Sequence, residues 1–400
     1  MTTQIGGIVR GEIGPVKLLV LQGTPFCNIN CRYCYLPNRS DTSQMSVQTV
    51  EAVVSRLRED QLLKGPLLVN WHAGEPLALP PQFYRSRIPA FTPLANDGIA
   101  VEQSLQTNGI LIDDAFCELF QEFNIAVGVS VDGPAFVHDR ERLTRAGRPT
   151  HARTEGGMSK LRAHGISFNA ICVLTDFSLQ HPDAIYEYFR DSKVRAVAFN
   201  IEEIEGVNRT SSISNHGYND RFRAFLERFW TRVEGDGGVL QVREFDDMEA
   251  RILDRHQRRN SQTDPFVNLN VAWNGDWSTF CPELLGVSFP EYPTFMLGNV
   301  HHGSMRAALA TEAFKRLYFD IQAGVDACRS ECAYFEVCGG GNPSNKISEN
   351  GSFRSTATIN CRNRILVVGD FIMDRIEERI CARKSHPALD RAEEKISVEP

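Results

Sequence analysis

The 400-residue sequence has no excess of positive charge, no long apolar run and no repeat at a fixed period. Its 43 Lys and Arg against 50 Asp and Glu leave a net charge of −7, which gives no support to nucleic-acid binding. No apolar stretch is long enough to cross a bilayer, so we expect no membrane partner. The first ten residues lack the charged and apolar regions of a signal peptide. Eleven cysteines without such a signal favour metal ligation in a reducing cytoplasm over disulfides, so we expect a cytoplasmic protein.

The first half of the chain alternates short apolar runs with helical patterns. Strands are expected at 16–21, 67–71, 100–105, 126–131, 167–174 and 196–201. Helices are expected at 46–62, 81–90, 113–124, 152–164 and 181–190, with Ser46 as the N-cap of the first. Alternating strands and helices predict an α/β fold with a parallel sheet and right-handed crossovers. Six such units make a partial (β/α)6 barrel, whose active site forms at the C-terminal ends of the strands.

Three cysteines follow the first expected strand on one short loop. Cys27, Cys31 and Cys34 have the spacing C-x-x-x-C-x-x-C, and thiolates at this density suit an iron–sulfur cluster. No fourth cysteine is near, which leaves one coordination position open, and an open position usually marks chemistry rather than structure. A zinc knuckle or a chance cluster of buried thiols are the alternatives.

Residues 25–37 resemble the signature loop of radical S-adenosylmethionine (radical SAM) enzymes. The resemblance implies a 4Fe-4S cluster whose open iron chelates the methionine part of S-adenosylmethionine (SAM). Reductive cleavage of SAM in that family gives a 5′-deoxyadenosyl radical that removes hydrogen from an unactivated C–H bond. Tyr33 resembles the aromatic residue that packs near the adenine.

Other expected strand ends carry residues similar to further motifs of this family. The stretch His72-Ala-Gly-Glu-Pro76 is similar to its Gly-Gly-Glu-Pro motif, which implies SAM contacts from Ala73, Gly74, Glu75 and Pro76; a simple Gly-Pro loop is the alternative. Gln106-Thr-Asn-Gly109 implies that Asn108 lies near SAM and Gln106 near the substrate. Ser130 and Asp132 resemble residues on the ribose side of SAM, or form an ordinary Asp-Gly turn. The resemblance also makes Arg142 or Arg153 a candidate partner of the SAM carboxylate, with a solvated basic loop as the alternative.

The C-terminal part of the chain carries a second set of cysteines. Cys328, Cys332, Cys338 and Cys361 resemble the outer auxiliary-cluster ligands of a SPASM domain, the iron–sulfur extension of many peptide-modifying radical SAM enzymes. This implies a second, auxiliary 4Fe-4S cluster, with a zinc site as the alternative. Where the pattern has a further cysteine this chain has Asn342, so the inner cluster of that domain is expected to be absent and Cys281 to be left without a role. Cys117, Cys172 and Cys381 are expected to be packing residues or partly exposed thiols.

These observations divide the chain into six expected parts. An Asn-Gly turn between two tryptophans at 271–277 predicts the hairpin that opens the second half. The parts are an N-terminal segment at 1–15, the radical SAM partial barrel at 16–240, a helical linker at 241–270, a SPASM-like auxiliary-cluster domain at 271–363, a C-terminal helix at 364–385 and a polar tail at 386–400.

The finer motifs are most similar to maturases of glycine-rich repeat peptides, which form three-residue cyclophanes. That resemblance implies a radical SAM enzyme that joins an aromatic ring to the Cβ of a nearby residue in a ribosomally made precursor peptide. It also implies an external electron donor such as flavodoxin or ferredoxin. An anaerobic sulfatase maturase and a thioether-forming maturase are the alternatives among enzymes, and a non-catalytic peptide-binding protein is the alternative outside them.

Ring closure in such a reaction releases a proton and an electron, so a base and an electron acceptor are needed. The auxiliary cluster is a candidate acceptor. Strand alternation predicts that Glu203 and Glu205 share a face, opposite Glu202, if the last strand runs that far. The candidate bases are Glu202, Glu203, Glu205 and Glu283.

Overall fold

A computed structural model describes residues 13–214, 217–254 and 260–385. Its strands form one sheet in the order β10-β9-β8-β1-β2-β3-β4-β5-β6-β7. All pairings from β8 through β1 to β7 are parallel, and β8-β9-β10 is antiparallel. The strands are β1 (Leu18–Leu21), β2 (Leu67–Trp71), β3 (Val101–Thr107), β4 (Ala126–Ser130), β5 (Phe168–Leu174), β6 (Ala196–Ile201), β7 (Gln241–Val242), β8 (Asn268–Val271), β9 (Asp276–Thr279) and β10 (Gly298–Asn299).

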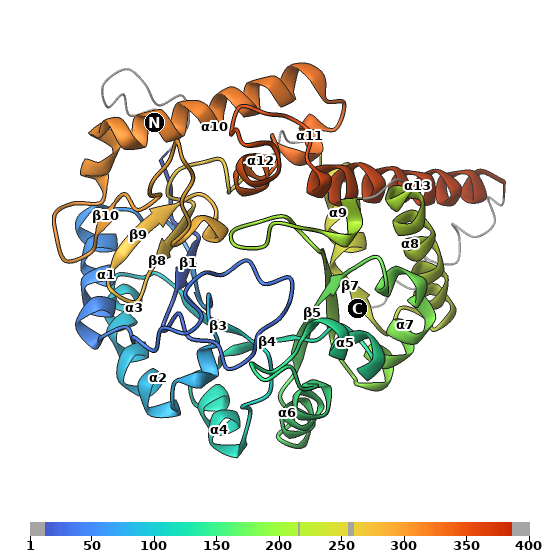
Figure 1. The fold of residues 1–400 in the computed structure, drawn as a ribbon, viewed down its shortest axis with the longest axis horizontal. Helices are drawn as coiled ribbons and strands as arrows, with labels where there is room; N and C mark the ends of the chain where they lie inside the picture. Colours follow the sequence, from blue (N-terminus) through green and yellow to red (C-terminus); the bar gives the residue numbers. More distant parts are fainter. Residues whose placement is uncertain (1–12, 215–216, 255–259, 386–400) are drawn as a thin grey trace, which may run out of the picture.

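The helices between the strands cover the outer side of the curved sheet (Figure 1). Ser46 caps the first of them, since its side chain accepts a hydrogen bond from the Thr49 amide at 2.9 Å. The helices of the first part are α1 (Val47–Glu59), α2 (Pro81–Arg87), α3 (Thr92–Asn96), α4 (Asp114–Glu122), α5 (Ala135–Glu141), α6 (His151–Ala163), α7 (Pro182–Asp191), α8 (Tyr218–Gly235) and α9 (Arg243–Leu253).

The C-terminal part spans the open side of the barrel. Figure 1 shows it in orange and red, crossing from the β8-β9-β10 edge of the sheet toward α8 and α9. The last helix, α13, packs against α9 and α8. The helices here are α10 (Glu312–Glu331), α11 (Phe335–Cys338), α12 (Pro343–Asn350), a π-helical turn at Cys361–Val367 and α13 (Val368–Ser385).

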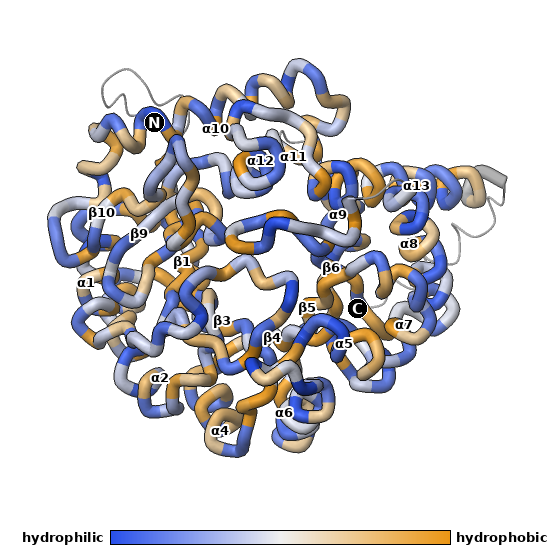
Figure 2. The backbone as a smooth tube through the Cα atoms, in the orientation of Figure 1, coloured by the Kyte–Doolittle hydropathy of each residue, from blue (hydrophilic) through white to orange (hydrophobic). Residues whose placement is uncertain are grey.

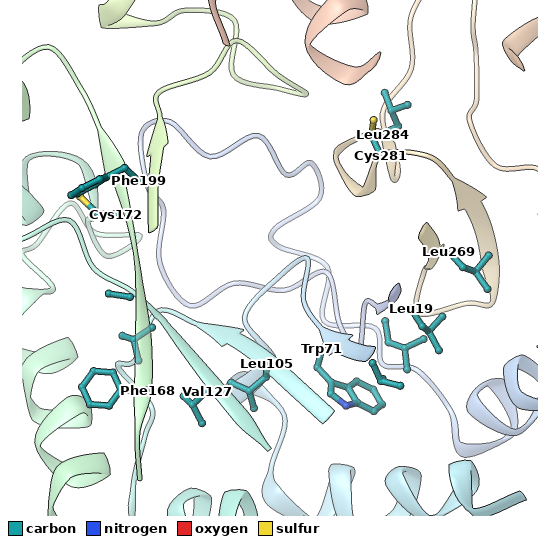
Figure 3. Close-up of a cluster of buried hydrophobic side chains, with 14 of the residues drawn as sticks. Leu19, Trp71, Leu105, Val127, Phe168, Cys172, Phe199, Leu269, Cys281 and Leu284 are labelled. Atoms are coloured by element: carbon teal, nitrogen blue, oxygen red, sulfur yellow. The ribbon is translucent and has the colours of Figure 1, made fainter. Parts of the chain in front are cut away.

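The core lies between the sheet and its helices and continues into the C-terminal part. Figure 2 shows hydrophobic segments along the strands and hydrophilic ones on the outer turns of the helices. Alternating residues of adjacent strands, such as Leu105, Val127 and Phe168, are buried in this layer (Figure 3). Cys172 packs beside Phe199 in the same core. Because one apolar cluster extends from β1 to α13, the barrel and the C-terminal part stabilise each other.

The predicted α/β fold, a partial barrel of parallel strands followed by a C-terminal part, is confirmed. The six predicted parallel strands are present, four with slightly different ends. The sheet does not stop at the predicted domain limits, since β7 of the expected linker pairs with β6 and β8 pairs with β1. The division into parts therefore stays a prediction, and its first twelve residues and its tail at 386–400 lie outside the described residues.

Two helices of the C-terminal part carry or adjoin the second set of cysteines. Helix α10 continues to Glu331, so Cys328 is carried by regular helix. The stretch after Cys338 also contains helix α12, which is buried over most of its length. In the described part of the chain, no helix has the length and apolar character needed to cross a membrane.

Candidate active site

A cavity of about 240 Å³ lies at the C-terminal ends of the parallel strands. The segments that follow β1, β2 and β6 contribute to its wall, together with the last residues of β3, β4 and β5. The segment after β9 adds Glu283 from the C-terminal part. The cavity therefore lies where the barrel and the C-terminal part meet, at the position predicted from the strand order.

The predicted cluster loop is held by hydrogen bonds from the segment after α5. Asn30 donates its amide to the Leu143 carbonyl at 2.7 Å, and Arg32 donates to the Glu141 carbonyl at 3.0 Å. The Arg145 side chain donates to the Cys27 carbonyl at 3.0 Å. These bonds fix the loop backbone, and Cys27, Cys31 and Cys34 all line the cavity.

The three thiols interact with one another, as ligands of one cluster must. Burial raises the pKa of Cys27 to about 12, with the nearby Glu75, Cys31 and Cys34 adding to the shift. Burial likewise raises the pKa of Cys31 to about 12. Thiolates at Cys27 and Cys31 therefore need the positive charge of a metal centre to form. Together with Cys34, they fit a cluster that keeps one iron open.

In residues 13–214, 217–254 and 260–385, no group of three or more His, Cys, Asp or Glu side chains could hold a single metal ion. A cubane cluster needs a different arrangement of ligands from a single metal ion. Each thiolate binds its own iron atom, so the sulfurs surround the cluster and do not converge on one point.

The motif after β2 bends sharply toward the cysteine loop. Ala73 has φ +69° and Gly74 has φ +140°, and a Cβ on Gly74 would overlap the Thr24 carbonyl oxygen. The Glu75 amide donates to the Phe26 carbonyl at 2.7 Å. Glycine suits such a conformation, so Ala73 occupies a left-handed position at some cost, of the order of 1 kcal/mol or more.

The carboxylate of Glu75 holds this turn from inside. It accepts hydrogen bonds from the Leu77 amide (3.0 Å), the Thr107 hydroxyl (2.6 Å) and the Asn108 amide (2.9 Å). Its bonds join the segment after β2 to the end of β3, although burial still raises its pKa. Glu75 therefore shapes the backbone of this turn, of which Gly74 and Glu75 line the cavity.

The predicted ribose-side residues divide into two kinds. Ser130 lines the cavity, whereas Asp132 is not part of the cavity lining and is only 1% exposed. Asp132 accepts two hydrogen bonds from Arg142 at 2.9 and 3.0 Å and one from the Tyr33 hydroxyl at 2.5 Å. Arg142 and Tyr33 both reach the cavity, so Asp132 positions them there. Arg153, the other arginine considered, is exposed on α6.

The amides predicted after β3 face the cavity beside the cluster loop. The Gln106 side chain donates to the Ser130 hydroxyl at 2.8 Å and lies over Gly128, where a Cβ would overlap it. The Asn108 side chain donates to Asn28, between two of the cysteines, at 2.7 Å. Asn108 thus joins the floor of the cavity to the cysteine loop.

The candidate bases do not share one environment. Glu203, Glu205 and Glu283 converge, whereas the Glu202 carboxylate accepts hydrogen bonds from the amide and hydroxyl of Ser212. Strand β6 ends at Ile201, so the condition on which Glu203 and Glu205 were expected to share a face is not met, and strand alternation does not set their directions. All four residues line the cavity.

The three converging carboxylates repel one another. Burial, then Glu203 and Glu283, raise the pKa of Glu205 well above its ordinary value. Burial and the charge of Glu203 raise the pKa of Glu283 to about 7. One carboxylate oxygen of Glu283, Oε2, is buried without a hydrogen-bond partner. Such a carboxylate suits a general base near neutral pH.

Polar side chains of the C-terminal part hold the other two glutamates. Ser344 donates to Glu205, and Asn360 donates to Glu203. Asn345 lies at 3.5 Å from the second oxygen of Glu203. These partners leave Glu283 as the glutamate of the three with an unengaged oxygen.

Two cavity residues were missed in the sequence-based prediction. The Tyr35 hydroxyl lies 3.3 Å from His72 Nε2, and burial lowers the pKa of His72 to about 4, so its imidazole is neutral. The Tyr35 carbonyl accepts a hydrogen bond from the Val207 amide at 3.0 Å, and a Cβ on Gly206 would overlap it. Gly206 therefore lets the glutamate loop pack directly on the cysteine loop.

The four C-terminal cysteines also lie near one another. Burial raises the pKa of Cys361 to about 12, and Cys338, Cys332 and Cys328 add to this shift. The Gly341 amide donates to the Cys338 sulfur at 3.2 Å, within a Gly339–Gly341 turn in which all three residues have positive φ. Backbone amides directed at sulfur are a usual environment of cluster thiolates, so the residues fit the predicted auxiliary cluster.

Cys281 is paired with the asparagine that replaces the expected cysteine. Its thiol donates to Asn342 Oδ1 at 3.0 Å, and burial raises its pKa well above the ordinary value. Asn342 also caps α12 by accepting from the Ser344 amide at 3.0 Å. This thiol–amide pair gives Cys281 a polar neighbour, and the absence of the inner cluster stays a prediction.

Comparisons with known proteins agree with this geometry. The radical SAM superfamily model matches residues 21–205. The chain is 40% identical over 377 residues to an uncharacterized protein of Synechocystis sp., covering 92% of this chain and 94% of that one. It is 26% identical to a serine-type anaerobic sulfatase-maturating enzyme of Bacteroides thetaiotaomicron, covering 84% of each.

Solved structures share the fold. The native enzyme anSMEcpe with bound AdoMet and the Cp18Cys peptide superposes with a TM-score of 0.72 at 20% identity, covering 91% of this chain and 98% of that one. Streptococcus suis SuiB bound to precursor peptide SuiA superposes with a TM-score of 0.60 at 15% identity, covering 86% of this chain and 76% of that one. The superfamily model matches this chain, and the Synechocystis relative matches it over nearly its full length. The chain therefore belongs to the radical SAM superfamily and is an enzyme with S-adenosylmethionine and 4Fe-4S cofactors.

Proposed function

We propose that this enzyme forms a C–C crosslink between an aromatic ring and the Cβ of a nearby residue in a ribosomally made precursor peptide. The observation that carries the proposal is Glu283, a buried carboxylate with an unpartnered oxygen at the cavity that also contains the three cysteines. Known relatives and neighbours include enzymes named for sulfatase maturation and one bound to a precursor peptide, which supports a peptide substrate.

The proposed reaction replaces two C–H bonds by one C–C bond. Bound SAM supplies the radical that removes one hydrogen atom from the substrate Cβ. After the carbon radical attacks the ring, one proton and one electron must leave to restore aromaticity. We assign the proton to Glu283. An auxiliary 4Fe-4S cluster would be held by Cys328, Cys332, Cys338 and Cys361 and would supply an electron acceptor.

The chain's own residues prepare the two cofactor sites in this proposal. Cys27, Cys31 and Cys34 hold the SAM-cleaving cluster. Gly74, Glu75 and Asn108, with Tyr33 and Ser130, contact SAM, and Gln106 faces the substrate. Asp132 acts through Tyr33 and Arg142, because its own oxygens are engaged by them.

Formylglycine formation is the second candidate, because sulfatase maturases are among the relatives. The Cys281–Asn342 pair favours the crosslinking reaction, since it occupies the place where the resemblance expects an inner-cluster ligand. A Glu at 283, where sulfatase maturases have Asp, also favours it.

The test is co-expression with the small peptide encoded beside this protein, followed by mass spectrometry under anaerobic purification. We expect a loss of two hydrogens per modification and no backbone fragments between the joined residues. Conversion of Ser to formylglycine also removes two hydrogens from the peptide. Its aldehyde, however, reacts with hydrazine reagents, and backbone fragments are still seen on both sides of the modified residue. A thioether requires Cys in the peptide. An aldehyde or a Cys-dependent product would contradict the crosslink and support one of these alternatives.

The proposed ligand sets predict the iron content. Anaerobically reconstituted protein should contain about eight irons, four per cubane cluster. Replacing Cys328, Cys332, Cys338 and Cys361 by alanine should reduce this to about four. A parent value near twelve would contradict the prediction, because it would require a third cluster that includes Cys281.

A further inference from the structure

Lys346 is buried against one of the proposed auxiliary-cluster ligands. It lies on α12, is 2% exposed, and donates to the Cys328 sulfur at 3.3 Å and to the Gly324 carbonyl at 2.9 Å. Among the described residues, no carboxylate lies within ion-pair distance of it. Burying an ammonium group without an anionic partner is unfavourable in free energy, so a negative charge nearby would stabilise Lys346 in this position.

The local structure is built to admit this side chain. Gly324 lies on α10 four residues before Cys328, and a Cβ there would overlap the Phe353 carbonyl oxygen and lie 3.0 Å from Lys346 Nζ. Cys328 lies near the C-terminus of α10, where exposed carbonyls carry partial negative charge. Four thiolates beside a helix C-terminus form an unfavourable concentration of negative charge, and the Lys346 ammonium offsets it.

We propose that Lys346 raises the reduction potential of the auxiliary cluster. Charge and hydrogen bonds to the sulfurs are established determinants of cluster potential. A cation close to a ligand sulfur stabilises the reduced form, which carries one more negative charge than the oxidised form. A higher potential would make such a cluster a better acceptor for the electron released on ring closure, while Glu283 takes the proton. The inference rests on the proposed cluster assignment and adds the residue that sets its potential.

The experiment uses the full chain with Cys27, Cys31 and Cys34 replaced by alanine, so that only the auxiliary cluster remains. Its midpoint potential is measured by a redox titration followed by electron paramagnetic resonance. Adding Lys346→Met should lower the equilibrium constant for reduction at least tenfold, which is about 59 mV for one electron. Lys346→Arg, which keeps the charge, should recover most of the parent value.

The matched control is Lys315→Met, because Lys315 lies on α10, the helix that carries Cys328, and its ammonium pairs with Glu312. It should leave the potential unchanged. An intact cluster with an unchanged potential in Lys346→Met would overturn the inference. If Lys346→Met assembles no cluster, Lys346→Gln decides: a lowered potential supports the inference, and loss of the cluster with normal circular dichroism overturns it in favour of an assembly role. Absence of iron from the starting variant would instead overturn the cluster assignment.

Discussion

Alanine at Cys27, Cys31 and Cys34 together is expected to abolish 5′-deoxyadenosine formation. These thiols are the cavity's cluster ligands in our proposal, and burial keeps Cys27 and Cys31 protonated unless a metal centre binds. Without the cluster, no electron reaches SAM and its S–C5′ bond stays intact. The measurement is anaerobic incubation with SAM and dithionite, followed by chromatography of the nucleoside products.

Cys381→Ala is the matched control for this triple variant, because Cys381 is exposed on α13 and lies outside both cysteine sets. It should keep the parent rate. The triple variant should also retain the circular dichroism of the parent, since the loop backbone is held by Leu143, Glu141 and Arg145 rather than by the thiols alone. 5′-Deoxyadenosine from the triple variant at the parent rate would refute the assignment.

The fold and the cluster loop were predictable from the sequence because both depend on local patterns. The apolar runs at 67–71 and 196–201 match β2 and β6 residue for residue. The spacing of Cys27, Cys31 and Cys34 places three thiols on one loop whatever the rest of the chain does. Parallel strand order then brings that loop to the same edge of the sheet as the motif after β2.

The remaining parts of the site depend on contacts between distant segments. Glu283 meets Glu203 and Glu205 across about eighty residues, and the strand that was expected to direct the two glutamates ends at Ile201. Their position comes instead from Gly206, whose lack of a side chain lets the loop pack on Tyr35. No pattern in the sequence of residues 202–206 specifies that contact.

Lys346 illustrates a different limit. A lysine in a polar stretch is exposed in most proteins, and its burial here follows from the approach of α12 to α10 at Gly324. The same approach brings Ser344, at the start of α12, to Glu205 at the active-site cavity. One short helix therefore contacts both proposed centres.

The second large effect concerns proton removal. Glu283→Gln is expected to leave SAM cleavage intact and to lower crosslink formation by about 10²- to 10⁴-fold, the usual contribution of a general base. Glutamine keeps the shape of the side chain but cannot accept the proton. Both products, 5′-deoxyadenosine and crosslinked peptide, are measured in the same reaction.

Glu202→Gln is the matched control, because the Glu202 carboxylate already accepts hydrogen bonds from Ser212. It should crosslink at a rate close to the parent. Glu203→Gln and Glu205→Gln complete the set. If all four variants crosslink at the parent rate, the base is water or another residue and the proposal fails.

The pH dependence identifies the base more sharply than the loss of rate. The pKa of Glu283 is raised to about 7 by burial and by the charge of Glu203. A base acts in its deprotonated form, so the parent crosslinking rate should rise with pH through about 7 and level off above it. Glu203→Gln removes one repelling charge and should move the midpoint of that rise to lower pH, while Glu283→Gln should remove the rise. A midpoint that stays at the parent value in Glu203→Gln would show that the titrating group is not Glu283.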